Sequence, residues 1–149
     1  MKLLRQNCQK MFYQVLKYDP QPFENEDFIK LKERLMGNVV FMCGLYKVDI
    51  VSVEIIKLCI TMLLTSVKKK LGQSEEQPID AEERHYTEFD CEKLCKMVEL
   101  LGASLSEKSP KYTDEVVENL KDLSSNTKLS YRARCFLKVC LMHLHLLTT

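Results

Sequence analysis

Apolar residues recur at steps of three and four over most of this 149-residue chain, and this spacing constrains the fold more than any other feature. One stripe lies between positions 27 and 47 and consists of Phe28, Leu31, Leu35, Val39, Met42 and Leu45. A second lies between 52 and 71 and consists of Val53, Ile56, Ile60, Leu63, Val67 and Leu71. Such stripes are typical of amphipathic helices that bury one face.

The same spacing predicts four further helices, over about 3–18, 87–107, 114–125 and from 130 onward. Thr87 and Ser130 supply hydroxyls that suit helix N-caps, and the pair Ser109-Pro110 is expected to break the chain. Four Gly and four Pro are too few for the turns of an all-β sandwich. We therefore predict an all-α fold of about six helices, with short links that favour antiparallel hairpins stacked in an α-solenoid of HEAT or armadillo type.

The length fits one domain over 1–149, interrupted by an acidic, aperiodic stretch over 72–87 that we expect to be a flexible loop. Three details concern packing. Phe41 is expected in the core, and Phe136 on the apolar face of the last helix. Gly37 and Gly44 lower helix propensity, which indicates close approach of a neighbouring helix.

Charge and composition exclude several classes of function. The 22 basic and 21 acidic residues leave a net charge of +1, which gives no electrostatic case for DNA or membrane partners. No glycine-rich loop can cradle a phosphate. The N-terminus lacks a signal-peptide pattern, and the apolar runs are too short to span a membrane. Seven cysteines within apolar patterns then favour a reducing, cytoplasmic setting.

Catalytic and metal chemistry are not expected. His85, Cys91 and Cys95 do not follow the spacing of a zinc knuckle, so we predict no metal site. A cysteine nucleophile would need a nearby base, and the few histidines are badly placed for this role. We therefore predict neither an enzyme nor a cofactor.

Two basic clusters are candidate binding sites. Lys68, Lys69 and Lys70 end a helix, where they either complement the helix dipole or contact the phosphates of RNA. Lys128, Arg132 and Arg134 lie at the start of the last helix, where positive charge opposes the dipole. This placement favours a partner, although one arginine could instead pair with Asp90 or Glu115.

The stretch from Arg34 to Lys47 (RLMGNVVFMCGLYK) resembles a signature of the middle domain of eukaryotic translation initiation factor 4G. The family pattern is approximately basic-x-Leu-Gly-Asn-Ile-x-Phe-Ile-Gly-Glu-Leu-Phe-Lys, and this chain departs from it at Met36, at Val40 and at Cys43-Gly44. Four other segments resemble the same domain in order, namely LLRQNCQKMF from Leu3, IIKLCITMLL from Ile55, EKLCKMVELLGASL from Glu92 and SYRARCF from Ser130.

The resemblance implies the C-terminal part of that HEAT-repeat domain, and a scaffold that binds a DEAD-box RNA helicase of the initiation factor 4A type. It also implies other initiation factors and mRNA as partners. Arg132 and Arg134 match the family motif and, with Lys128, become the expected helicase contacts. Three alternatives remain open. The first is a related middle domain from mRNA decay, poly(A)-binding-protein interaction or cap binding. The second is an RNA-binding module that acts without a helicase, and the third is a truncated paralogue with no stable fold or function.

Overall fold

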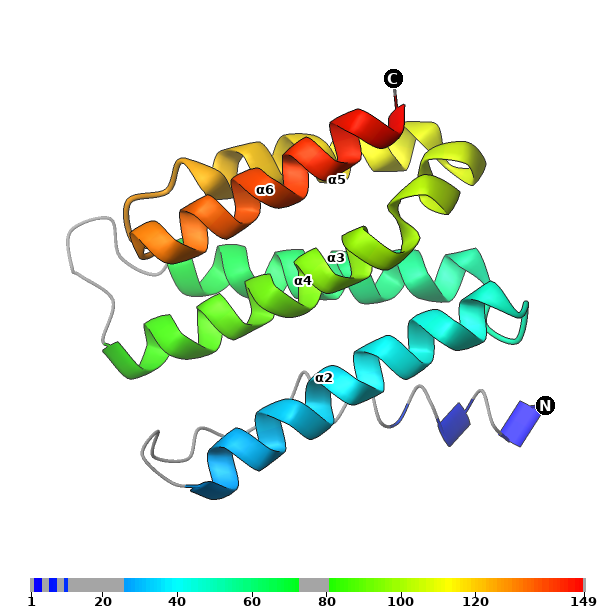
Figure 1. Cartoon of the computed structure of the whole chain (residues 1–149), viewed down its shortest axis with the longest axis horizontal. Coiled ribbons are helices and arrows are strands. Elements are labelled where there is room, and N and C mark those ends of the chain that lie inside the picture. Colours follow the sequence, from blue (N-terminus) through cyan, green and yellow to red (C-terminus); the bar gives the residue numbers. More distant parts are fainter. Residues whose placement is uncertain (1, 4–5, 8–9, 11–25, 73–80, 149) are drawn as a thin grey trace. The chain divides into compact units, whose positions relative to one another are not determined.

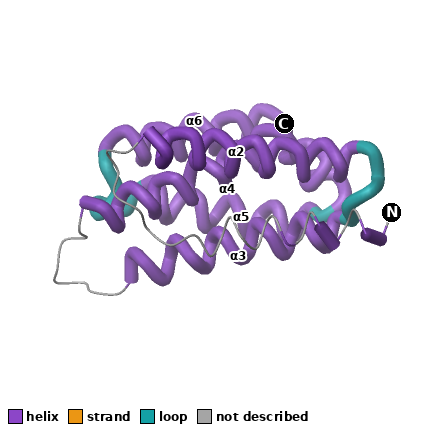
Figure 2. Tube along the Cα trace, turned by 90° about the horizontal axis from the view of Figure 1, so that it is seen from below, coloured by secondary structure: helices purple, strands orange, loops and turns teal. Residues whose placement is uncertain are grey.

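The computed structural model describes residues 2–3, 6–7, 10, 26–72 and 81–148, and all regular structure within them is helical (Figures 1 and 2). The longer helices are α2 (Glu26–Lys47), α3 (Val53–Gly72), α4 (Ala81–Lys108), α5 (Pro110–Ser124) and α6 (Tyr131–Thr148). The all-α class is thus confirmed for the described ranges, whereas stacking in a HEAT or armadillo solenoid stays a prediction. The helix expected over 3–18 lies mostly outside the described residues.

The chain divides into two compact units, residues 1–59 and 60–149, and the division falls within α3. In the first unit, a short turn joins α2 to α3. The Ile50 amide donates to the Leu45 carbonyl at 2.9 Å, and Asp49 adopts a left-handed backbone with φ of 62°. The Cys59 thiol then contacts the sulfur of Met42 at 3.7 Å. The first turns of α3 therefore lie beside the end of α2, as the hairpin prediction requires.

The buried face of α2 contains the predicted Leu35, Val39, Met42 and Leu45. Two expectations about this helix are wrong. Phe41 is 50% exposed, because it precedes Met42 by one residue and so points about 100° away from the stripe. Gly37 and Gly44 are both exposed, and a Cβ atom added to either would meet nothing within 4 Å. No neighbour in the described structure needs the space that these glycines leave.

In the second unit, α4, α5 and α6 contact one another pairwise, and α5 and α6 run side by side in Figure 1. Their shared core consists mainly of Leu94, Met97, Leu101, Leu105, Val116, Leu120, Leu123, Leu137, Cys140 and Leu144. Phe136 was expected in this core but is 46% exposed, and its neighbour Leu137 is fully buried instead. Among the described residues, no helix has both the length and the apolar character needed to cross a membrane.

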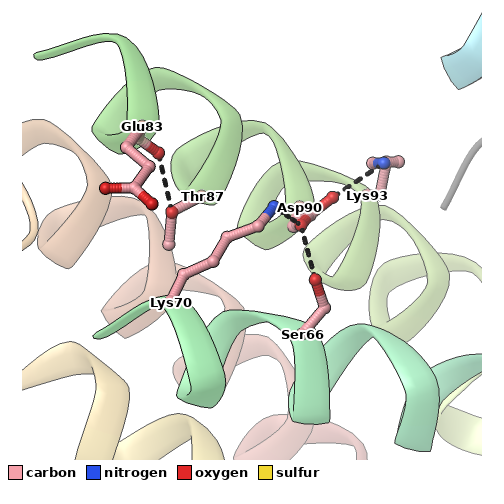
Figure 3. Close-up of polar contacts among 6 residues, drawn as sticks. All are labelled: Ser66, Lys70, Glu83, Thr87, Asp90 and Lys93. Atoms are coloured by element: carbon pink, nitrogen blue, oxygen red, sulfur yellow. Dashed lines mark hydrogen bonds and ion pairs between the residues drawn. The ribbon is translucent and has the colours of Figure 1, made fainter. Parts of the chain in front are cut away.

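Helix α4 begins at Ala81, so residues 81–87 are helical and the expected loop is shorter at its C-terminal end. The predicted N-cap at Thr87 is wrong. Thr87 is fully buried inside the helix, and its hydroxyl donates to the Glu83 carbonyl at 2.8 Å (Figure 3). A threonine hydroxyl that bonds one turn back in this way is accommodated within a helix. Residues 73–80 of the expected loop lie outside the described ranges.

The bounds of α5 also differ from expectation. The helix begins at Pro110 rather than near 114, and Ser109 is its N-cap residue. Proline is suited to the first position of a helix, because the amide hydrogen it lacks has no partner there. The pair Ser109-Pro110 therefore ends α4 and starts α5 at once. At α6 the predicted cap is confirmed, since the Ser130 hydroxyl oxygen accepts a hydrogen bond from the Ala133 amide at 3.1 Å.

Candidate functional site

The C-terminal end of α3, the first turns of α4 and the start of α6 meet at one end of the second unit (Figure 1). Lys128 donates from Nζ to the Leu71 carbonyl at 2.6 Å, which ties the α5–α6 connection to α3. The Ser130 amide donates to the Glu88 carboxylate at 2.9 Å, which ties α6 to α4. We give the name basic junction to this region together with six cations: Lys68, Lys69, Lys70, Lys128, Arg132 and Arg134.

The three lysines of α3 do not form one uniform cluster at this junction. Lys70 is half-buried, and its ammonium lies 3.0 Å from the Asp90 carboxylate. Lys68 is exposed and donates to the side-chain amide oxygen of Asn119 in α5. Lys69 is exposed in the last turn of the helix, where its charge complements the dipole. Of the predicted RNA contacts, Lys70 is thus committed to an internal ion pair.

The three cations in and just before the first turn of α6 also differ. Lys128 is half-buried and bound to Leu71, so it serves the fold. Arg132 is exposed. Arg134 is half-buried, with its guanidinium carbon 5.9 Å from the centre of the Tyr131 ring, and its buried Nε has no hydrogen-bond partner among the described residues.

The alternative that an arginine of α6 pairs with Asp90 is wrong. The Asp90 carboxylate instead lies 3.0 Å from the Lys70 ammonium and 2.8 Å from the Lys93 ammonium, and it accepts a hydrogen bond from the Ser66 hydroxyl at 3.3 Å (Figure 3). This network joins α3 to α4. Sequence reasoning missed it because only the Asp90–Lys93 spacing of three residues, on an otherwise apolar helix face, pointed to a pair.

Lys93 is the least expected member of the network, since only 1% of it is exposed. Its ammonium also lies 4.6 Å from the centre of the Phe89 ring. Burial lowers the pKa of Lys93 from its ordinary 10.5, and the nearby Asp90 charge opposes that shift. A carboxylate satisfied by three donors and a paired ammonium are suited to holding helices together rather than to proton transfer.

His85 is exposed on α4, whereas Cys91 and Cys95 of the same helix are buried. Burial raises the pKa of the Cys91 thiol to about 12, which keeps it protonated and weakly nucleophilic. Cys95 instead donates a hydrogen bond to Cys140 of α6, which raises the pKa of Cys95 and lowers that of Cys140. No group of three or more potential ligands in the described ranges could hold a metal ion.

Within the described residues, the basic junction thus combines internal ion pairs and hydrogen bonds with the exposed cations Lys68, Lys69 and Arg132. Over 111 residues the chain is 33% identical to eukaryotic translation initiation factor 4G of Cucumis melo, and this match covers 74% of the chain and 5% of that protein. It is also 25% identical, over 137 residues, to a von Willebrand factor A domain-containing protein of Dictyostelium discoideum, covering 88% of the chain and 6% of that protein.

The chain thus spans only about a twentieth of the length of these curated relatives. No family model matches it, and no solved structure matches it. The first similarity supports a region like part of initiation factor 4G, which is the family that the sequence motifs resemble.

Proposed function

We propose that this chain is a non-enzymatic helical scaffold of translation initiation, which binds a DEAD-box RNA helicase of the initiation factor 4A type through the start of α6. The observation that carries the proposal is the 33% identity to initiation factor 4G over three quarters of the chain. The motifs in α2, α3, α4 and α6 resemble segments of the same family in the same order, and this order also supports the proposal.

The helicase contact is assigned to Arg132 and Arg134. Both lie in the first turn of α6, where positive charge opposes the helix dipole and so does not serve helix stability. Other groups accept hydrogen bonds from the backbone amides at the start of α6. The Ser130 hydroxyl accepts from the Ala133 amide, and the Glu88 carboxylate accepts from the Ser130 amide. Arg132 is exposed, and its planar guanidinium suits an acidic surface on the partner. Lys128 becomes a positioning residue, since its ammonium is engaged with Leu71.

RNA is a second candidate ligand of the same junction. Lys68 and Lys69 remain exposed near the C-terminal end of α3, whereas Lys70 is bound to Asp90. A phosphate backbone that meets several such cations binds with an affinity that falls steeply as salt rises. Lys68→Glu with Lys69→Glu should weaken RNA binding and leave helicase binding unchanged.

Calorimetric titration of the protein with purified initiation factor 4A, with and without nucleotide, tests the proposal. We expect binding that Arg132→Glu with Arg134→Glu weakens by about tenfold or more, as loss of central arginines at an interface does. The matched control is Lys47→Glu with Lys111→Glu, which makes the same charge change at two exposed lysines elsewhere. Equal affinity of both double variants would show that the surface is wrong. Absence of binding by helical wild-type protein would overturn the scaffold proposal itself.

A further inference from the structure

The outward face of α6 carries an apolar strip. Tyr131, Cys135, Val139 and Met142 follow one another at steps of four, four and three, so they lie along one line of the helix. Three of them are strongly exposed, and Cys135 is half-buried. We call these four residues the α6 strip. It extends for about 17 Å, or three helical turns.

The strip is distinct from the face that packs α6 into the second unit. That inner face consists of Ala133, Leu137, Cys140 and Leu144, all of which are buried. Helix α6 is therefore apolar on two opposite sides, and such a helix is ordinarily covered on both. An exposed apolar row bordered by polar residues is typical of an interaction surface.

The charges on α6 point to the chemistry of what covers the strip. The helix has no Asp or Glu, and its cations are Arg132, Arg134 and Lys138. At about 100° per residue, Lys138 lies just beyond Tyr131 on one side of the strip, and Arg132 lies just beyond Val139 on the other. Each border of the apolar row thus carries a cation. A complementary surface would place apolar side chains on the row and carboxylates along both edges.

We propose that the α6 strip docks an amphipathic helix of a protein partner whose apolar stripe is bordered on both sides by acidic residues. A second copy of this chain fits poorly, because two α6 strips would bring like charges together. A membrane surface also fits less well. Membrane-surface helices rely on Trp, Phe and Leu, whereas the strip consists of Tyr, Cys, Val and Met, and Tyr and Met are enriched at protein interfaces.

The proposal goes beyond helicase binding and shares only Arg132 with it, so its test uses Val139 and Lys138. The probe is a labelled synthetic helix with leucine at heptad positions a and d and glutamate at e and g, followed by fluorescence anisotropy. A second peptide carries lysine at e and g. We expect the glutamate peptide to bind the protein, and we expect Val139→Glu to lower the affinity for this peptide by about tenfold. Lys138→Glu should lower the affinity for the glutamate peptide and raise the affinity for the lysine peptide.

The matched control is Val48→Glu, because Val48 is 64% exposed and Val139 is 65% exposed. Unchanged binding by Val48→Glu supports the proposal, as does unchanged helicase affinity of Val139→Glu, which separates the two surfaces. Equal binding of both peptides, or of neither, would overturn it. So would binding to phosphatidylserine vesicles, or self-association in sedimentation, that Val139→Glu abolishes while the glutamate peptide does not bind.

Discussion

Lys128 Nζ lies 2.6 Å from the carbonyl oxygen of Leu71, although 57 positions separate the two residues. The last carbonyls of a helix have no partner within it, and α3 ends one residue later, at Gly72. The ammonium satisfies one of these carbonyls and places positive charge at the negative end of the helix dipole. The backbone of Lys128 is held as well, because its amide donates to the Asn126 side chain at 2.9 Å.

Replacing Lys128 by methionine should therefore lower the free energy of unfolding by about 1–2 kcal/mol, as loss of a charged hydrogen bond at a half-buried site does. The matched control is Lys121→Met, which removes only an exposed pair with Glu118 and should cost less than about 0.5 kcal/mol. Urea denaturation of both variants measures the difference. Equal losses would mean that the contact with Leu71 adds nothing to stability.

The Ser130 cap of α6 gives a second expectation. Its hydroxyl accepts the Ala133 amide, while its own amide donates to Glu88. Ser130→Ala should destabilise the protein by about 1 kcal/mol, and Ser130→Asp, which keeps an acceptor at the cap, should restore most of that loss. Thermal unfolding of the two variants checks the order. An alanine variant as stable as the aspartate variant would contradict the capping role.

Asp90 should be the most sensitive polar residue, because Lys93 is almost fully buried beside it. Asp90→Asn leaves that ammonium without its counter-charge and should cost about 3 kcal/mol. Adding Lys93→Met removes the stranded charge, so the double variant should be more stable than Asp90→Asn alone. Chemical denaturation of the single and double variants gives the coupling between the two positions. Simple additivity of the two losses would contradict the ion pair.

Local pattern predicted the helices well where one stripe of apolar residues continued without interruption. The range expected for α2 began at Asp27 and the helix begins at Glu26, while α3 was expected from Ser52 and begins at Val53. The start of α4 was misplaced because a cap signal at Thr87 is only local. The buried environment around Thr87 outweighs it, and its hydroxyl finds a partner inside the helix.

The candidate site was only partly predictable for a related reason. Arg132 and Arg134 could be predicted as candidate contacts because their positive charge opposes the helix dipole. This pattern can be recognised from the sequence of a single helical turn. The contacts of Lys128 with Leu71 and of Lys70 with Asp90 join segments that are distant in sequence. Only the folded second unit brings α3, α4 and the α5–α6 connection together, so no spacing rule could separate structural cations from exposed ones.

Gly37 occupies a position of α2 that has room for a larger residue. It lies within α2, it is exposed, and an added Cβ would meet nothing within 4 Å. Gly37→Ala should therefore raise the free energy of unfolding by about 0.5–1 kcal/mol, because alanine costs less backbone entropy in a helix. Circular dichroism during urea denaturation measures the change. A loss of stability would instead indicate that a neighbouring group occupies the space beside Gly37.

The buried thiols predict how stability depends on pH. Burial raises the pKa of both Cys59 and Cys91 from 9.0 to about 12, so the folded chain keeps these protons where the unfolded chain releases them. Their contribution is fully present below pH 9 and is lost as the pH rises toward 12. Between pH 9 and 10 the loss amounts to roughly 1 kcal/mol for each thiol.

Cys59→Ala with Cys91→Ala should consequently flatten the decline of stability over this interval, even if the variant is less stable at pH 7. Denaturation in urea at pH 8, 9 and 10, with a phosphine reductant present, compares the two profiles. The lowered pKa of Lys93 acts in the opposite direction but is common to both proteins, so the difference between their profiles isolates the thiols. Parallel profiles would mean that Cys59 and Cys91 ionise as readily in the folded chain as in the unfolded one.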